Sequence, residues 1–246
     1  MNWYSEALDE VLKKLETDVR QGLSDEQAAA RLEKYGPNKL QEKPPRTFLM
    51  RFIDQMKDVM ILILLAAALV SLGMSIYHYL HGMEADWVEP IVIVVIVLLN
   101  GILGVIQESK AEAALEALKK MSAPLARILR NGTEMAVPSA ELVPGDIILL
   151  EAGDFVPADC RLIHSASLKI DEAALTGESV PVEKNAETLI EEKAPLGDRL
   201  NMVYSGCAVS YGRGSAVVVE TAMKTEMGKI ASMLEGEGQA MTPLQV

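Results

Sequence analysis

The stretch VMILILLAAALVSLGMSIYHYL, residues Val59–Leu80, decides the class of fold to which this chain belongs. It contains no Asp, Glu, Lys or Arg, and it is long enough to cross a lipid bilayer as an α-helix. A second uncharged run, rich in Val, Ile and Leu, follows at residues 90–107. A core helix of a soluble protein can be this apolar, but two in tandem rarely are. The sequence therefore predicts a transmembrane hairpin with its first helix at residues 59–80.

The second helix of this hairpin is expected to continue beyond the membrane. Residues 107–121 are rich in Ala, Glu, Lys and Leu, which are strong helix formers, and Pro124 is where a helix must end. We predict one helix over residues 88–121, made of a membrane span and a cytoplasmic extension. A membrane helix followed by a separate surface helix is the alternative.

Basic residues lie on one side of the predicted hairpin only. They precede the first span and follow the second: Lys39, Lys43, Arg46, Arg51, Lys57, Lys110, Lys119 and Lys120. The connection at residues 81–89 has neither Lys nor Arg. By the positive-inside rule, the N-terminus and everything after the second helix are cytoplasmic in this multi-pass membrane protein. In that reducing compartment, Cys160 and Cys207 are expected to be free thiols within strands.

The N-terminal region has a different pattern. Residues 5–19 place Leu8, Val11, Leu12 and Leu15 on one face of a helix. Ser24 with Gln27 forms the capping-box signature of a second helix at residues 25–35, which Gly36-Pro37 ends. We therefore predict an N-terminal helical cap at residues 1–37 and a linker at residues 38–58, whose first part, residues 38–47, cannot be helical because of Pro44-Pro45.

The pattern changes to period two after the hairpin. Short runs rich in Val, Ile and Leu alternate with turn clusters between residues 126 and 221, and Asn131-Gly132 is typical of a hairpin turn. This spacing predicts an all-β domain at residues 122–234, a sandwich or distorted jelly roll, that ends in a helix. Residues 235–246 are expected to be a linker. The predicted class is an α+β membrane protein, with a two-helix transmembrane hairpin, an all-β domain and N-terminal helices.

One motif within the β-domain combines a turn with a carboxylate: Leu175-Thr176-Gly177-Glu178-Ser179-Val180-Pro181. Gly177 permits a tight backbone turn, while the hydroxyl groups of Thr176 and Ser179 are suited to fixing the loop. The pattern predicts that Glu178 lies on an exposed turn. Taken alone, the motif favours a simple solvated turn over a functional loop.

Three motifs follow one another in a distinctive order: Val143-Pro144-Gly145-Asp146, then Gly153-Asp154-Phe155-Val156-Pro157-Ala158-Asp159, then residues 171–181. Together they resemble the actuator domain of P-type ATPases, and residues 22–38 resemble the N-terminal cap of P-type cation pumps. The resemblance extends over essentially the whole chain. It implies that Glu178 handles the water that hydrolyses an aspartyl-phosphate, in a loop shaped by Thr176, Gly177 and Ser179. It assigns no cofactor-binding and no metal-binding residue.

Within that family, Trp87-Val88-Glu89-Pro90, Asn100 and Gln107-Glu108 resemble the second membrane helix of calcium pumps of the sarcoplasmic-reticulum type. Thr242-Pro243-Leu244-Gln245 is similar to the segment that leads those pumps into a third membrane helix. The Cys-x-x-Cys modules of the heavy-metal branch are absent from the sequence. The resemblance implies the N-terminal portion of a P2-type pump that moves Ca²⁺, with pumps for Na⁺, K⁺ or H⁺ as alternatives.

The resemblance also implies the partners of the chain. These are the lipid bilayer, the transported cation, and the phosphorylation, nucleotide-binding and remaining membrane parts of the pump, which bind ATP and Mg²⁺. Nucleic acid is not expected as a partner, because the net charge is −12 and no basic patch is interleaved with aromatic residues.

The chain contains no Asp-Lys-Thr-Gly-Thr and no Walker-type loop, so it is not expected to hydrolyse ATP by itself. A natural two-span membrane protein is therefore an alternative to a pump. Its actuator-like β-domain would be non-catalytic and would bind a partner. Residues 241–246 favour the pump, because a chain meant to end there gains nothing from them.

Overall fold

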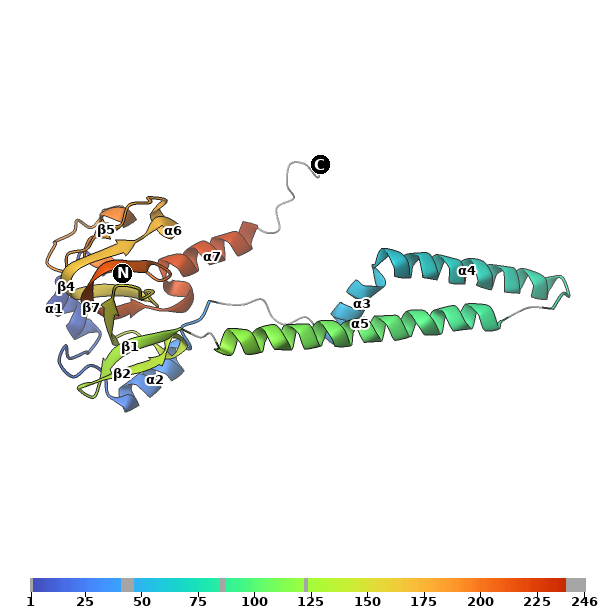
Figure 1. Cartoon of the computed structure of the whole chain (residues 1–246), viewed down its shortest axis with the longest axis horizontal. Coiled ribbons are helices and arrows are strands. Elements are labelled where there is room, and N and C mark those ends of the chain that lie inside the picture. Colours follow the sequence, from blue (N-terminus) through green and yellow to red (C-terminus); the bar gives the residue numbers. More distant parts are fainter. Residues whose placement is uncertain (1, 41–46, 85–86, 122–123, 238–246) are drawn as a thin grey trace. The chain divides into compact units, whose positions relative to one another are not determined.

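The structure, a computed structural model, describes residues 2–40, 47–84, 87–121 and 124–237 (Figure 1). The chain divides into two compact units. One is the helical segment Lys43–Ser122; the other joins the N-terminal segment Met1–Glu42 to the segment Ala123–Val246. Most of the linker expected at residues 235–246, and residues 41–46 of the linker expected at 38–58, lie outside the described residues.

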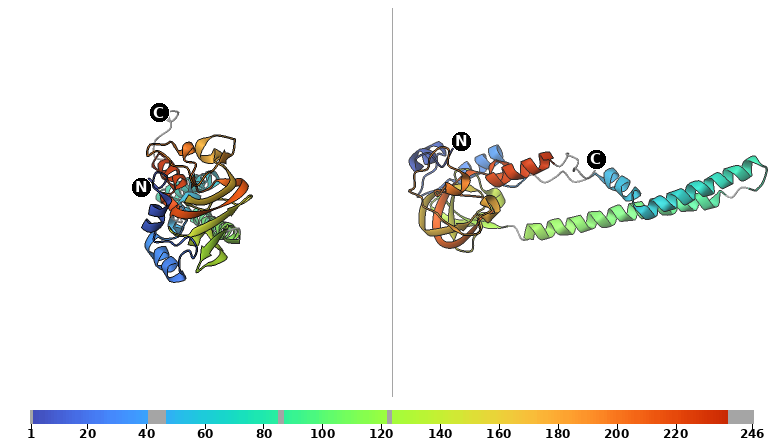
Figure 2. Two further views of the ribbon diagram at one scale, coloured as in Figure 1. Left: turned by 90° about the vertical axis from the view of Figure 1, so that its left-hand side faces the viewer. Right: turned by 90° about the horizontal axis from the view of Figure 1, so that it is seen from above.

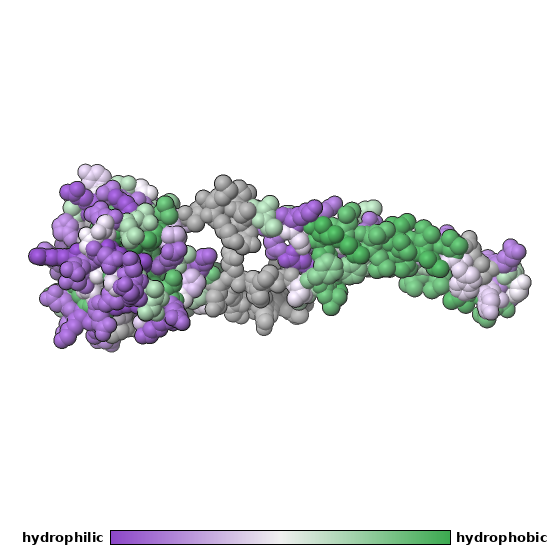
Figure 3. All heavy atoms as spheres, turned by 90° about the horizontal axis from the view of Figure 1, so that it is seen from below, coloured by the Kyte–Doolittle hydropathy of each residue, from purple (hydrophilic) through white to green (hydrophobic). Residues whose placement is uncertain are grey.

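The helical unit contains two helices long and apolar enough to cross a membrane. They are α4 (Val59–Leu80) and α5 (Val88–Met121), and α5 is one continuous helix over the whole of this range. Only 17% and 22% of the residues in their most apolar windows are buried, whereas a core helix of a soluble protein would be mostly buried. Figure 3 shows hydrophobic side chains covering this hairpin, in contrast to the largely hydrophilic surface of the other unit. An apolar surface of this extent requires lipid or further protein around it.

A short amphipathic helix, α3 (Phe48–Met56), lies inside the segment that we predicted as a linker. The Thr47 hydroxyl caps it by accepting a hydrogen bond from the Met50 N–H group at 3.4 Å. The helix packs on α5 at Gly101 and Gly104, where the absence of side chains admits Phe52, Met56 and Gln55. Tertiary packing against small residues thus forms a helix in a segment that we predicted as a linker.

The strands of the second unit form one antiparallel sheet within the described residues. Its order is β2-β1-β3-β7-β4-β5, with β6 paired to β4. The strands are β1 (Leu125–Arg130), β2 (Thr133–Pro138), β3 (Ile147–Glu151), β4 (Asp159–Asp171), β5 (Val182–Glu183), β6 (Met202–Val203) and β7 (Ala208–Glu220). The hairpin predicted at Asn131-Gly132 is confirmed, because both residues have positive φ, 48° and 70°, as a type I′ turn requires.

The long strands β4 and β7 form the centre of the sheet (Figure 2). Their pairing is interrupted by several register shifts, which bend the strands. Buried side chains from both strands, such as Leu162, Ile170 and Val217, make the core. Both cysteines are free and buried; Cys160 lies in β4, but Cys207 precedes β7, so the expectation of two strand cysteines was half wrong.

The N-terminal helices belong to the same unit as the sheet. Helix α1 (Leu8–Lys14) contributes Val11 and Leu12 to the sheet's core. It is shorter than the predicted helix, because Glu16 adopts a left-handed conformation with φ 50°. Helix α2 (Asp25–Tyr35) has the predicted capping box between Ser24 and Gln27. The described part of this unit also contains three turns of 3₁₀-helix, Ser139–Glu141, Leu196–Asp198 and Ala222–Lys224, the short helix α6 (Ala173–Thr176) and helix α7 (Glu226–Glu237).

Candidate functional site

The four residues predicted to form the site are consecutive and lie between β4 and β5. The chain leaves β4 at Asp171, makes the single helical turn α6 (Ala173–Thr176), and reaches β5 at Val182. Figure 1 shows α6 and β5 beside each other at one end of the sheet. We call residues 176–181 the exposed loop, because Gly177, Glu178, Ser179, Val180 and Pro181 are all solvent-exposed.

Local hydrogen bonds explain why the chain turns here. The Asp171 carboxylate accepts a bond from the Ala173 N–H group at 3.0 Å, which starts α6. The Glu172 carbonyl accepts bonds from the N–H groups of Leu175 and Thr176, both at 2.9 Å. Gly177 then ends the turn in the left-handed conformation, with φ 77° and ψ 0°. A glycine is favoured at such a position because it has no Cβ.

The Thr176 hydroxyl connects the two sides of this turn. It donates to the Glu172 carbonyl at 3.1 Å and accepts from the Glu178 N–H group at 3.3 Å. The backbone of Glu178 is therefore tied to that of Glu172 through one side chain. We assigned a similar fixing role to Ser179, but its side chain makes no hydrogen bond with the described residues.

Glu178 presents a carboxylate to solvent. Within the described part of the chain, no hydrogen bond or ion pair engages its side chain. A free carboxylate on a tight turn can enter a site formed by another part of a protein, where it can orient a water molecule or accept its proton. Glycine on one side and a short hydroxyl residue on the other leave room for that approach.

A buried ion pair that the sequence did not predict joins two residues on either side of the exposed loop, Glu172 before α6 and Lys184 after β5. The Lys184 Nζ atom is 2.6 Å from Glu172 Oε1, and neither side chain is exposed to solvent at all. Burial raises the pKa of the Glu172 carboxyl and lowers the pKa of the Lys184 ammonium, while the attraction between them opposes both shifts. Neither Glu172 oxygen has a further hydrogen bond of favourable geometry among the described residues.

No sequence signal marks this pair strongly. Lys and Glu are rarely fully buried, so both residues read as part of a solvated loop. The one available hint is the alternation between the exposed Glu183, which ends β5, and the next residue, Lys184, whose side chain is expected on the opposite face.

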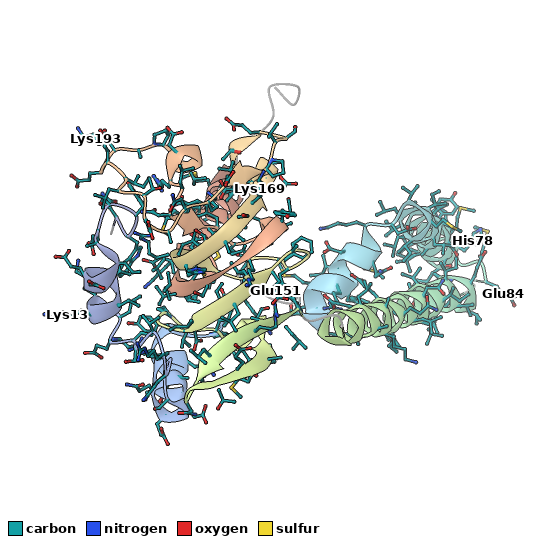
Figure 4. The ribbon with its side chains drawn as sticks, turned by 60° about the vertical axis from the view of Figure 1, so that its left-hand side comes forward. Lys13, His78, Glu84, Glu151, Lys169 and Lys193 are labelled. Atoms are coloured by element: carbon teal, nitrogen blue, oxygen red, sulfur yellow. The ribbon has the colours of Figure 1, made fainter. Side chains whose placement is uncertain are left out.

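The aspartates of the two upstream motifs have structural roles. Asp146 is fully buried and accepts two bonds from Arg130, both at 2.7 Å, and one from the Val143 N–H group. Asp154 accepts a bond from Arg127 at 3.0 Å and one from the Glu151 N–H group; Figure 4 labels Glu151, at the end of β3. These motifs therefore build the turns that enter the strands, as their Pro, Gly and Asp residues predicted.

Asp159 closes the last of these motifs and holds helix α7. Its two carboxylate oxygens accept bonds from the N–H groups of Ser205 at 2.9 Å and Glu226 at 2.8 Å. Burial raises the pKa of Asp159 to about 6, although both hydrogen bonds oppose that shift. The first residue of α7 is thus fixed to the start of β4. No cluster of three or more metal-ligating side chains occurs among the described residues.

Two protein families match the chain. The family described as P-type ATPase actuator domain matches residues 120–235. The family described as cation transporter/ATPase, N-terminus, matches residues 3–71. The two matches cover the strands of the β-sheet unit, the N-terminal helices and the first long helix as far as residue 71.

Individual relatives agree with these matches. The chain is 46% identical to calcium-transporting ATPase 1 of Bacillus cereus, over 99% of its own length. It is 44% identical to a calcium-transporting ATPase of Bacillus subtilis, over 100% of its length, and 43% identical to a cation-transporting ATPase of Synechocystis, over 96%. The chain spans only 27%, 26% and 25% of these relatives, respectively.

Proposed function

Because this chain belongs to the P-type cation-transporting ATPases, we propose that it forms the N-terminal portion of an ATP-driven pump for Ca²⁺. The observation that carries the proposal is Glu178, a free carboxylate on an exposed turn whose backbone is held by Thr176. In the proposed reaction, an aspartate in another part of the pump receives the phosphoryl group of ATP. Mg²⁺ and ATP are bound there, outside this chain.

The proposed task of Glu178 is the second half of the cycle. A water oxygen attacks the phosphorus atom, the bond between phosphorus and the aspartyl oxygen breaks, and the proton of the water passes to the Glu178 carboxylate. Inorganic phosphate and the free aspartate result. Thr176 and Gly177 set the direction of the Glu178 backbone, and Ser179 completes the exposed loop.

A mobile carrier for this carboxylate has a physical advantage. An aspartyl-phosphate that met Glu178 immediately would be hydrolysed before its energy could move an ion. If the β-sheet unit moves toward the phosphate only at one stage of the cycle, hydrolysis is coupled to movement of the membrane helices. In this proposal the coupling runs through residues 38–58, the cytoplasmic part of α5, and residues 235–246.

The proposed arrangement in the membrane places both soluble parts in the cytoplasm. The basic residues lie before the first span (Lys39, Arg51 and Lys57) or after the second span (Lys110). The connection between the two spans, residues 81–89, carries no Lys or Arg. Calcium is favoured over Na⁺, K⁺ and H⁺ because two of the relatives described above are named calcium-transporting ATPases.

The test uses the complete pump in membrane vesicles and measures phosphoenzyme formed from labelled ATP. We expect phosphoenzyme to form only when Ca²⁺ is present, and to reach a higher steady level in Glu178→Ala because its hydrolysis is blocked. Glu187→Ala is the matched control, since Glu187 is also exposed but lies outside the exposed loop. Formation that requires Na⁺ or K⁺ instead would contradict the calcium assignment, and equal steady levels in the two variants would contradict the role of Glu178.

A further inference from the structure

The ion pair between Glu172 and Lys184 occupies an unusual position. Its residues bracket the exposed loop, with Glu172 directly before α6 and Lys184 directly after β5. Both side chains are fully buried, while the loop between them is exposed. The pair therefore links the chain before the exposed loop to the chain after it through two buried side chains.

Net stabilisation of the fold does not explain such a pair well. Removing two charges from water is costly, and the attraction between them repays that cost only with excellent geometry and additional hydrogen bonds. The Glu172 carboxylate lacks those additional bonds among the described residues. Lys184 adds a long contact, 3.5 Å, from Nζ to the Arg199 carbonyl, and its Nζ atom lies 5.9 Å from the centroid of the Tyr204 ring. A pair of apolar side chains would serve the core at least as well.

A role in fixing the position of the exposed loop explains the ion pair better. The backbone on either side is already fixed: the Lys184 N–H group donates to the Leu168 carbonyl at 2.8 Å, and β5 pairs with β4 at Ile170. Just beyond Lys184, the Arg161 side chain donates to the Ala186 carbonyl at 3.2 Å. The Lys184 side chain thus extends from a backbone that hydrogen bonds hold in place, and its ammonium group forms the ion pair with the Glu172 carboxylate.

From Glu172 a short chain of contacts leads to Glu178. The Glu172 carbonyl accepts the Thr176 hydroxyl at 3.1 Å, and the same hydroxyl accepts the Glu178 N–H group at 3.3 Å. A displacement of Glu172 therefore displaces the backbone of Glu178. Proton transfer and water orientation depend steeply on position, because a shift of about 1 Å can reduce a rate about a hundredfold.

We propose that the buried Glu172–Lys184 ion pair is a positioning device that, through Thr176, holds Glu178 in the place required for hydrolysis of the aspartyl-phosphate. Both side chains are fully buried, so Glu172 and Lys184 are positioning residues rather than catalytic ones. The inference rests on the proposed function of Glu178. It assigns to two residues outside the exposed loop a share in the rate of dephosphorylation.

The experiment compares forms of the complete pump that differ only in this pair. Glu172→Gln with Lys184→Met removes both charges at similar volume, which avoids leaving one charge buried alone. Glu172→Lys with Lys184→Glu exchanges the charges and can re-form the pair. For each form, phosphoenzyme is made from labelled ATP, its level is measured, and its decay is followed after a chase with unlabelled ATP and a chelator.

We expect the neutral pair to form phosphoenzyme at the normal level but to lose it about tenfold more slowly or worse, because Glu178 is misplaced. Amide hydrogen exchange in the peptide that covers residues 173–183 should be faster. The exchanged pair should restore most of the decay rate and the exchange protection. If the pair served only the stability of the fold, its loss would lower the amount of phosphoenzyme formed and its decay rate together. The neutral pair and the exchanged pair would then give the same decay rate.

A second variant keeps the inference testable if changes at the pair prevent folding. Thr176→Val retains the shape of the side chain but removes the hydroxyl that joins Glu172 to Glu178, so it should slow decay in the same manner. Normal decay in Thr176→Val, or in a folded neutral pair, would overturn the positioning role. Glu178→Ala, measured in parallel, separates the two claims: if it too decays normally, the proposed function itself is wrong.

Discussion

At the scale of single residues, the candidate site is built from ordinary turn chemistry. Asp171 starts a helical turn, Gly177 ends it in the left-handed region, and Thr176 bridges the backbones of Glu172 and Glu178. Each of these residues fixes a backbone position, while the exposed Glu178 carboxylate has no hydrogen bond or ion pair among the described residues. The candidate site thus consists of one exposed carboxylate on a backbone whose position its neighbours fix.

The residue scale also yields a prediction about pH, at Asp159. Its pKa is raised from 3.8 to about 6 by burial, so the folded β-sheet unit binds a proton more tightly there than the unfolded chain does. The stabilisation is fully present below pH 4 and is lost as the pH rises through about 6. The expected loss in the free energy of unfolding is about 2 kcal/mol between pH 4 and pH 7.

The measurement compares the chain with its Asp159→Asn variant in urea denaturation, followed by the fluorescence of Trp3 in a Trp87→Phe background. Trp3 is a suitable reporter because its Nε1 atom donates to Glu220 in the folded unit. The difference in unfolding free energy, original minus variant, should fall as pH rises from 4 to 7. A difference that grows with pH would show that the carboxylate is stabilised in its charged form.

At the scale of elements, the packing of helix α3 against α5 at Gly101 can be tested. A Cβ atom at Gly101 would come within 2.7 Å of Met56 Cε and 2.8 Å of Phe52 Cε2. In Gly101→Leu the larger side chain should therefore push α3 away, at a cost of about 1–3 kcal/mol. The undocked form exposes Arg51, which is 8% exposed in the docked helix.

Trypsin cleavage after Arg51 measures this undocking, because cleavage of a transiently open segment follows its population. We expect cleavage in Gly101→Leu to be about tenfold faster than in the original chain. Gly73→Leu is the matched control, since no atom lies within 4 Å of a Cβ built at Gly73. Adding Phe52→Ala to Gly101→Leu should return the rate toward normal. Equal rates for the two leucine variants would mean that Gly101 does not seat α3.

The elements also show what a sequence reveals and what it conceals. Helix α2 and the hairpin at Asn131-Gly132 were predictable because a capping box and a turn dipeptide act locally. Helix α3 was not, because its stability depends on glycines of a distant helix. Likewise, the four candidate site residues, 176–179, could be picked out by their motif, whereas the Glu172–Lys184 pair could not. Its burial arises from sheet pairing and tertiary packing around two charged side chains that are normally solvated.

At the scale of the whole molecule, the chain combines an apolar hairpin with a charged unit of mixed helices and sheet (Figure 3). This separation fits a membrane protein with a water-exposed domain. The proposed orientation predicts which exposed residues a membrane-impermeant reagent reaches from outside. Figure 4 labels two suitable positions, Glu84 near the end of α4 and Lys193 on the β-sheet unit.

Cysteine labelling in intact cells tests that orientation. Cys160 and Cys207 are 0% and 1% exposed, and burial raises the pKa of the Cys207 thiol to about 12, so neither native thiol should react. Glu84→Cys should react with an impermeant maleimide from outside, and Lys193→Cys only after the membrane is permeabilised. Labelling of Lys193→Cys in intact cells would reverse the proposed topology.

The central claim is that Glu178 drives hydrolysis of the aspartyl-phosphate. The most direct test is the decay of labelled phosphoenzyme in the complete pump, after a chase that stops its formation, in the original form and in Glu178→Gln. Gln keeps the size of the side chain but cannot accept the proton of the water. The account predicts normal formation and decay slowed by about a hundredfold or more, in the range that a general base contributes. Decay at the original rate would contradict it.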